Sequence, residues 1–470
     1  MARHLILIAA AILGLNGLVA ALGTWYWRDL FFSLGLFLSL VPMVRFLVVE
    51  DGDTPFFPVL SMVYGVYYCV FGIIPFELHR TVAGVSDEAM DLASVFSCLG
   101  ILSLLVGYYF VRRPKLRNPL QGEKRFSPRS ASLMVLLGLI SSAGWMAKFI
   151  WKVPLAFEAL LTLVSEPLLF VFAGLFLLQL QKRLPRWMIA VNWFGFVPVV
   201  LATSLATSLL FPFIRLLVLG LLVYLLIRRR LPWRQVGVFG SILLILFVMK
   251  TGFRQLESAT NKEKLAGTQE LAKRLAVYGE VIRALGETPT AEMFQANVNI
   301  VASRLDLTHM FGFIIDHAPV QVPYQRGKTY QGLVWKFVPR LLYPEKPIER
   351  MGNDLGHDLG WLDPEDDDTS VNLPQMVELY LNFGPVGIPI GMCLIGALYG
   401  WLFNLFCKDG TKVQQVFGLF MASNLVNIES NLSIVLGGLF YLIVVMPLLL
   451  HALLHRSLEG SEAESAVSAL

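Results

Sequence analysis

Charge is scarce in this sequence: 15% of the residues are Asp, Glu, Lys or Arg, while 56% are hydrophobic. Ordinary soluble domains carry roughly a quarter charged residues. The apolar residues are also gathered into continuous runs, and a run of about 18 or more predicts a membrane-spanning helix. The composition therefore excludes an ordinary soluble domain and predicts an all-α polytopic membrane protein.

Cysteine and the common nucleotide and metal motifs are also rare or missing. The four cysteines form no CxxC pair and lie in or at the end of apolar runs, which excludes a disulfide framework and a thiolate metal site. The sequence has no GxxxxGK[ST], no GxGxxG ahead of a helix and no HExxH. The acidic run DPEDDD (363–368) is more typical of a solvated loop than of a metal site. We therefore expect no cofactor, no metal and no nucleic-acid partner.

The apolar runs predict about twelve membrane spans. Basic residues in short loops mark the cytoplasmic side of a membrane protein, and the basic loops of this chain fall on one side if there are twelve spans. Both termini are then cytoplasmic. The spans are centred near 5–23, 30–49, 57–76, 92–111, 130–150, 167–181, 187–206, 209–227, 235–251, 384–406, 413–430 and 432–453.

One segment between spans is long enough to fold as a subdomain. We predict nine membrane helices in 1–251, a periplasmic loop subdomain in 252–383, three more membrane helices in 384–455 and a disordered cytoplasmic tail in 456–470. Within the subdomain we expect helices over 254–285 and 291–318, followed by an irregular part rich in proline and glycine.

Arg215 is the first candidate functional residue, because it lies inside an apolar run. It precedes the cytoplasmic boundary at Arg228 by roughly 20 Å of helix, which places it in the outer half of the membrane. A guanidinium there requires a partner or a wet cavity. Pro212, just before it, favours a broken span that opens outward. We interpret Arg215 as functional, with snorkelling to the outer surface as the alternative.

The outer segment contains a block in which cations alternate with aromatic side chains, RGKTYQGLVWKFVPRLLYPEKP (326–347). Aromatic residues of this kind settle at membrane interfaces, so the neighbouring cations are expected at the depth of phosphate headgroups. Arg340 and Lys346 are the main candidates, with Lys328 and Arg304 as additional ones. Arginine can grip two phosphate oxygens at once.

Candidate bases lie after this block. Glu378, just before the span expected at 384, should sit at the mouth of an outward cavity, and His357 in GNDLGHDLG (352–360) is the other candidate. Glu429, among asparagines in NLVNIESNLS (424–433), suggests an additional polar pocket with Tyr380. The carboxylates of Glu378 and Glu429 could instead be merely solvated.

The run GKTYQGLVWKFVPRLLYPEKP, a glycine-bearing loop and then VELYLNFGPVGIPIGMCLIGALYG resemble the Wzy-type O-antigen and exopolysaccharide repeat-unit polymerases. The resemblance is strongest over about 325–400. It implies a C-type glycosyltransferase-like fold in the bacterial inner membrane. The reaction would move a growing glycan from undecaprenyl pyrophosphate onto a sugar hydroxyl of a new lipid-linked repeat unit. The pattern of an arginine followed by ten residues and a glycine is not matched, because Gly352 comes one position late after Arg340.

The resemblance also implies roles for individual residues. Arg215, Arg340 and Lys346 would hold the pyrophosphate, and Glu378 or His357 would accept the proton of the acceptor hydroxyl. The donor and acceptor glycans and the bilayer are the implied partners, with a chain-length regulator and a flippase beside them. On physical grounds, preorganised cations in a cleft of low dielectric stabilise a pyrophosphate leaving group. A single displacement with one base inverts the anomeric carbon and requires no metal.

Three other functions fit parts of the pattern. An O-antigen ligase, which transfers polysaccharide to a lipid A core, has the same layout of spans and outer loop. A secondary transporter or flippase also fits twelve spans with both termini inside, but its longest loop is commonly a central cytoplasmic one. A scaffold for polymer secretion without catalysis is the third.

Overall fold

The structure is a computed structural model, and it describes most of the chain. The described residues are 2–21, 26–49, 54–73, 84–112, 128–150, 154–206, 210–260, 276, 279, 283, 305–336, 338, 343, 345, 351–366, 370–408, 410–439, 442 and 443. Within these residues every regular element is helical and no strand occurs. The prediction of an all-α protein is therefore confirmed for this part of the chain.

The helices follow one another with short breaks, and two stretches are π-helical. The elements are α1 (Ala2–Ala21), α2 (Arg28–Val48), α3 (Phe56–Gly65), η1 (Val66–Val70), α4 (Phe71–Ile73), α5 (Asp87–Val111), α6 (Pro128–Ile150), α7 (Leu155–Ser165), α8 (Pro167–Leu180), α9 (Arg186–Ala190), η3 (Val191–Phe196), α10 (Val197–Ala206), α11 (Phe211–Arg228), α12 (Trp233–Thr260), α15 (Thr308–His317), η4 (Lys328–Tyr330), α16 (Gln331–Lys336), α17 (Met351–Asp358), α18 (Gln375–Phe383), η5 (Gly384–Val386), α19 (Gly387–Phe406) and α20 (Lys412–Leu425).

Eight helical stretches in the described part of the chain are long and apolar enough to cross a membrane. The protein is therefore a polytopic membrane protein, while the count of twelve spans stays a prediction. α20 ends at Leu425, short of a full span, and most of the span expected at 432–453 lies outside the described residues. The eight stretches are Arg28–Val48, Phe56–Ile73, Asp87–Val111, Ser130–Lys148, Leu161–Leu180, Arg186–Leu205, Phe211–Arg228 and Gln375–Phe406.

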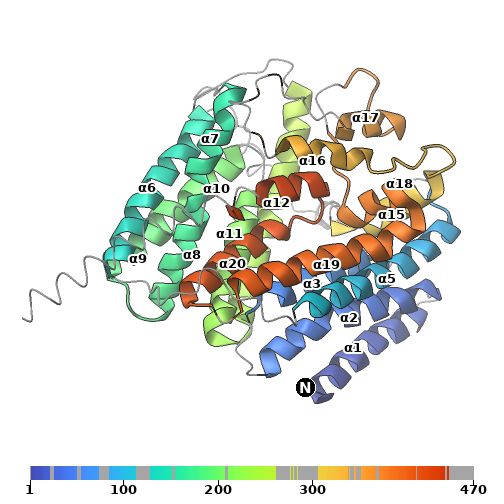
Figure 1. The fold of residues 1–470 in the computed structure, drawn as a ribbon, viewed down its shortest axis with the longest axis horizontal. Coiled ribbons are helices and arrows are strands. Elements are labelled where there is room, and N and C mark those ends of the chain that lie inside the picture. The colour runs from blue at the N-terminus through green and yellow to red at the C-terminus, as the bar shows by residue number, and fades with distance from the viewer. Residues whose placement is uncertain are drawn as a thin grey trace, which may run out of the picture.

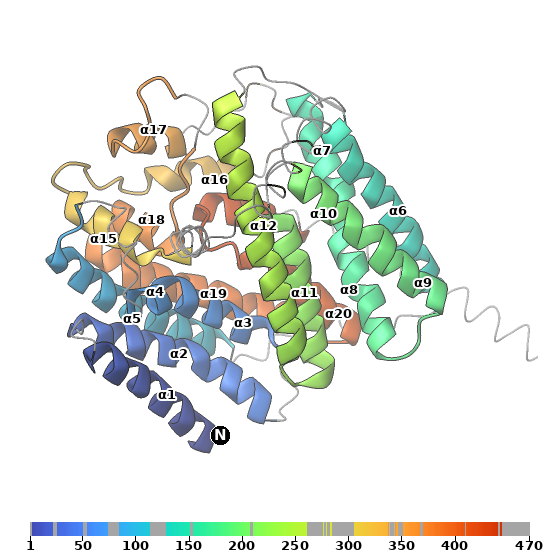
Figure 2. The same cartoon turned by 180° about the vertical axis from the view of Figure 1, so that it is seen from behind.

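The helices form two groups with a seam between them (Figures 1 and 2). The first group contains α1 to α5 with α15, α18 and α19, and the second contains α6 to α10. α11, α12 and α20 lie between the groups, and both α11 and α20 pack on α8. Within the segment expected to be a periplasmic subdomain, α15 packs on α5 and η1; a separate subdomain over 252–383 stays a prediction.

The first group is built on a close contact between α5 and α19. A Cβ added to Gly107 would overlap the carbonyl oxygen of Cys393, and one added to Gly396 would overlap that of Leu104. A Cβ on Gly400 would lie 2.7 Å from the carbonyl oxygen of Tyr108. Small residues allow membrane helices to approach to backbone contact, which strengthens their packing in lipid. The glycines of GALYG (396–400) therefore determine how α19 sits on α5.

α18 and α19 form a hairpin rather than one straight span. Gly384 has a φ of +63° and ends α18. A Cβ on Gly387 would lie 2.5 Å from the carbonyl oxygen of Leu379, so α18 folds back along the first turns of α19. The sequence correctly predicts where the long apolar helix begins. It does not predict that the preceding segment lies beside this helix.

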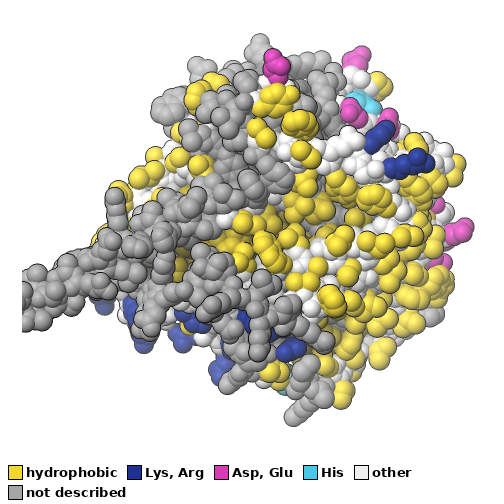
Figure 3. Space-filling view, viewed as in Figure 1, with side chains coloured by type: hydrophobic (Ala, Val, Ile, Leu, Met, Phe, Trp, Pro, Cys, Tyr) yellow, Lys and Arg dark blue, Asp and Glu magenta, His cyan; other side chains and the backbone are white. Residues whose placement is uncertain are grey.

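The outer surface of the protein agrees with a membrane setting. Figure 3 shows a broad hydrophobic area, with Lys and Arg side chains gathered near its two ends. This distribution is what a bilayer requires, because cations lie at its two interfaces and apolar side chains between them.

Candidate functional site

Arg215 lies in the second turn of α11 and is 4% exposed. Its Nη1 donates to both carboxylate oxygens of Glu166, at 3.1 and 3.3 Å. Glu166 lies at the junction between α7 and α8, so the ion pair joins the second helix group to the seam. The rings of Phe211 and Phe420 lie 5.9 and 5.8 Å from the guanidinium carbon. Arg215 therefore has a protein partner and does not snorkel to the surface.

The ion pair uses only part of the guanidinium. Nε and Nη2 of Arg215 are buried, and neither has a hydrogen-bond partner among the residues that the structure describes. These two nitrogens share one edge of the planar group. Their N–H groups are parallel and can hold two oxygens of a single phosphate or carboxylate. Because an unpaired buried donor is costly, this edge is a candidate anion-binding position.

A second polar region lies where α18 begins. The backbone N–H of Gln375 donates to the carbonyl of Ile428 at 3.2 Å, and that of Leu373 donates to Asn431 Oδ1 at 2.8 Å. Both acceptors lie in the irregular stretch 426–431 that follows α20. Non-helical backbone at membrane depth occurs where it is buried in protein or borders a cavity. The start of α18 and the end of α20 thus satisfy each other's backbone groups.

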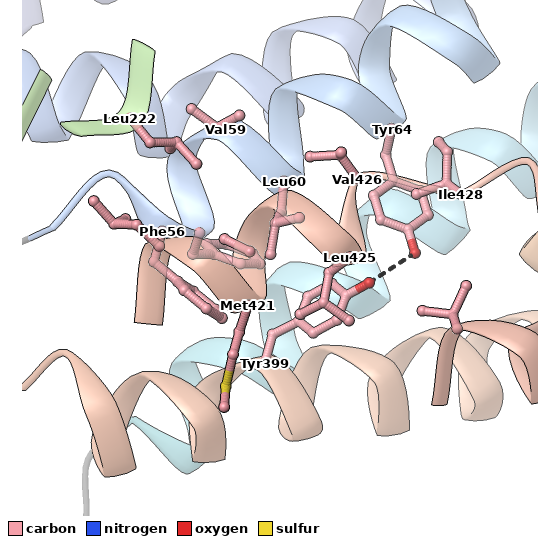
Figure 4. Close-up of a cluster of buried hydrophobic side chains, with 14 of the residues drawn as sticks. Phe56, Val59, Leu60, Tyr64, Leu222, Tyr399, Met421, Leu425, Val426 and Ile428 are labelled. Carbon is pink, nitrogen blue, oxygen red and sulfur yellow. Dashed lines mark hydrogen bonds between the residues drawn. The ribbon is translucent and has the colours of Figure 1, made fainter. Parts of the chain in front are cut away.

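Tyrosines from the helix α3 and its π-helical continuation η1 surround this junction. The hydroxyl of Tyr64 donates to Gln375 Oε1 and lies 3.4 Å from the hydroxyl of Tyr399 (Figure 4). Tyr399 lies about 18 Å further along α19 than Gly387, well inside the span. The hydroxyl of Tyr67 donates to Glu429 Oε1 at 2.6 Å. Polar groups so deep in a membrane protein commonly mark functional pathways.

Glu378 belongs to this junction and is fully buried, with 0% exposure. Its Oε2 accepts from the backbone N–H of Leu432 at 2.7 Å, at the start of the helix that follows the irregular stretch. A carboxylate in that position satisfies a free helix N–H and interacts favourably with the helix dipole. The sequence placed Glu378 at the mouth of an outward cavity, whereas the structure places it within the packed interior. The reason is the fold-back of α18, which carries its first turn inward.

The C-terminal end of α18 contacts the start of the basic and aromatic block. Asn382 accepts from the backbone N–H of Gly327 at 2.8 Å and donates to Thr329 at 2.7 Å. Lys328 is exposed beside this contact. Burial, and after it the carboxylate of Glu378, raises the pKa of the Tyr330 phenol. The block is thus fixed to the same short helix that carries Glu378.

The remaining predicted site residues either lie apart from the contacts described above or fall outside the described residues. Tyr380 is buried among the rings of Phe96, Phe311 and Tyr324. His357 lies partly exposed in α17, and no hydrogen bond joins its ring to another residue of the described part. Arg304, Arg340 and Lys346 lie outside the described residues. A common site for Arg215, Arg340 and Lys346 therefore stays a prediction.

Sequence reasoning missed Glu166 and the Tyr64–Gln375 pair. Glu166 had a usable signal, because VSEPLLF (164–170) puts a carboxylate directly before an apolar run, and Arg215 needed a partner at that depth. The tyrosines gave no such signal. A tyrosine in an apolar run is equally compatible with an interfacial or a core position.

The helices and polar contacts together define a class: a multi-pass membrane protein with charged and polar groups buried between its helices. Comparison with known families shows the family to which the chain belongs. The model of the family described as a domain of unknown function, DUF8712, matches residues 66–456, and the chain belongs to this family. No curated protein matches the chain, and no solved structure does.

Proposed function

We propose that this protein is a membrane glycosyltransferase that polymerises oligosaccharide repeat units carried on undecaprenyl pyrophosphate, at the periplasmic face of the bacterial inner membrane. The resemblance of residues 325–400 to the Wzy-type polymerases suggests this reaction. The observation that carries the proposal is the buried Arg215, whose Nε and Nη2 have no partner among the described residues.

Arg215 suits a lipid-linked pyrophosphate for two reasons. Its position in an apolar helix favours a ligand that enters from the membrane, as a polyprenyl-linked substrate does. Glu166 occupies Nη1 and holds the plane of the guanidinium, so the opposite edge is oriented before the ligand arrives. A preorganised donor pair stabilises the charge that develops on the leaving pyrophosphate more than mobile water does.

The reaction breaks the bond between the anomeric carbon and the pyrophosphate oxygen as a sugar hydroxyl of the acceptor attacks. The electron pair leaves with the pyrophosphate, and the hydroxyl proton passes to a base. Glu378 and His357 are the candidates for this base. Glu378 would have to exchange its contact with Leu432 for one with the acceptor, so a movement of α18 would accompany catalysis in that case.

The proposal is tested with the purified full-length protein in liposomes and a purified lipid-linked repeat unit as the sole glycan. We expect a ladder of longer glycans in the absence of any lipid A core, which distinguishes a polymerase from a ligase. Arg215→Lys keeps the charge but loses the two-oxygen grip, so we expect a rate lower by about 10². Arg183→Lys, at an exposed position, is the matched control. Unchanged ladders from Arg215→Lys and Arg215→Gln at equal protein amounts would refute the assignment.

A further inference from the structure

A tight turn at Gln325–Lys328 closes the C-terminal end of α18. The backbone N–H groups of Gln325 and Arg326 donate to the carbonyls of Leu381 and Asn382, at 2.9 and 3.1 Å. Arg326 has a φ of +50° and Gly327 a φ of +88°. A left-handed conformation costs energy for any residue with a side chain, so the position of Arg326 favours glycine on backbone grounds. The backbone conformation therefore does not explain the arginine at this position, and a role of its side chain would.

The two cations of this turn have no partner among the residues that the structure describes. The side chains of Arg326 and Lys328 are exposed, and neither forms an ion pair or hydrogen bond with a residue that the structure describes. Cations near the end of a helix complement its dipole. Here, however, the carbonyls of Leu381 and Asn382 are already satisfied by backbone N–H groups. The helix end therefore does not account for both charges.

An exposed apolar stripe begins directly beside the turn. Val386, Ile390 and Leu394 are 62%, 58% and 65% exposed and follow one another at helical spacing, and Phe383, the 49% exposed last residue of α18, lies beside them. The ring of Phe383 lies 3.7 Å from the position that a Cβ on Gly327 would take. The stripe lies on the side of α19 away from α5, since the side facing α5 carries Gly396 and Gly400. From Val386 to Leu394 it extends about 12 Å along the helix axis.

We propose that the turn and the stripe together bind one anionic phospholipid of the bilayer. Arg326 and Lys328 hold the phosphate, and an acyl chain lies along Phe383, Val386, Ile390 and Leu394. Charge complementarity selects an anionic headgroup: two exposed cations, without an acidic partner in the described part of the chain, lie at one end of an apolar surface. The stripe faces outward from the bundle, which favours a bilayer lipid over a substrate held between helices. This inference does not rest on the proposed polymerase activity, and the test below separates the lipid site from the substrate site for which Lys328 is an additional candidate.

The test uses native mass spectrometry of the purified full-length protein with three probes: phosphatidylglycerol, phosphatidylcholine and undecaprenyl phosphate. We expect the wild-type protein to retain phosphatidylglycerol in preference to phosphatidylcholine. Each of Arg326→Gln and Lys328→Gln should weaken phosphatidylglycerol binding about fivefold, and the double variant about thirtyfold. Lys328→Arg should bind as the wild type does. Arg183→Gln, an exposed cation elsewhere, is the control and should leave binding unchanged.

Arg326→Gly separates lipid binding from a purely structural role. Glycine relieves the backbone at φ +50°, so this variant should be as stable as the wild type or more stable, yet bind phosphatidylglycerol about fivefold more weakly. Equal loss in Arg183→Gln, or no loss in the double variant, would overturn the proposal. It would also be overturned if the variants lost only undecaprenyl phosphate, because the turn would then belong to a substrate site.

Discussion

Removing the carboxylate of Glu166 should destabilise the protein more than removing the whole ion pair. The side chain of Arg215 is 5% exposed and that of Glu166 is 25% exposed. Breaking a buried pair by deleting one partner costs about 3–5 kcal/mol, because a buried charge is left uncompensated. Water reaches Glu166 in part, so we take the lower end and expect Glu166→Gln to cost about 3 kcal/mol. This corresponds to a shift of more than a hundredfold in the unfolding equilibrium.

The double variant Arg215→Met, Glu166→Gln also removes the guanidinium that Glu166→Gln leaves buried without a carboxylate partner. We expect its free energy of unfolding to lie within about 1 kcal/mol of the wild type, since buried pairs contribute little net stability. The measurement is equilibrium unfolding of the purified protein in mixed detergent micelles, for the two single variants and the double variant. A cost below about 1 kcal/mol for Glu166→Gln, or a double variant no more stable than Glu166→Gln, would refute the burial argument. Under the proposed function, the stable double variant makes no polymer.

Three further predictions concern the helix contacts. Glu378→Ala removes the acceptor of the Leu432 N–H in a fully buried place, so denaturant titration should show a loss of about 1–3 kcal/mol, and an unchanged midpoint would contradict this. Gly396→Val forces a side chain into a backbone carbonyl of α5; we expect poor recovery of monodisperse protein on gel filtration, while a normal profile would show that the helices can separate at no cost. Tyr67→Phe removes the hydrogen bond to Glu429 and should cost about 1.5–3 kcal/mol in the same titration, with no effect if the hydroxyl finds water instead.

The sequence predicted those features that follow from local composition. Apolar runs identified six of the eight long helical stretches within about five residues of their observed bounds, because a span must be apolar over its whole length. The exceptions are the eighth and the fifth: Gln375–Phe406 begins nine residues before the expected 384, and Leu161–Leu180 begins before the expected 167 and has Glu166 inside it. In a sequence, a carboxylate suggests the end of a membrane span. Glu166 can lie within the bundle because Arg215 on α11 compensates its charge.

The parts that could not be predicted depend on contacts between segments distant in sequence. Gly384 and Pro385 mark a break, yet nothing local states whether α18 continues outward or folds back. The direction is set by Leu379 packing on Gly387 and Gly391. The same holds for Glu378, whose burial results from that fold-back. Arg215 could be singled out from the sequence because a guanidinium in an apolar run is unusual wherever its partner lies; its functional role stays a prediction.

The contact between α5 and α19 also limits how this protein can move. The backbones of α5 and α19 touch at glycines. Neither helix can slide along the other, because a neighbouring residue with a larger side chain would then meet a backbone carbonyl of the opposite helix. The pair must therefore tilt or turn as one piece and carry the hairpin with it. Under the proposed function, any widening that admits a lipid-linked substrate would then occur at the seam, where α11 and α20 pack on α8 through side chains that can exchange rotamers.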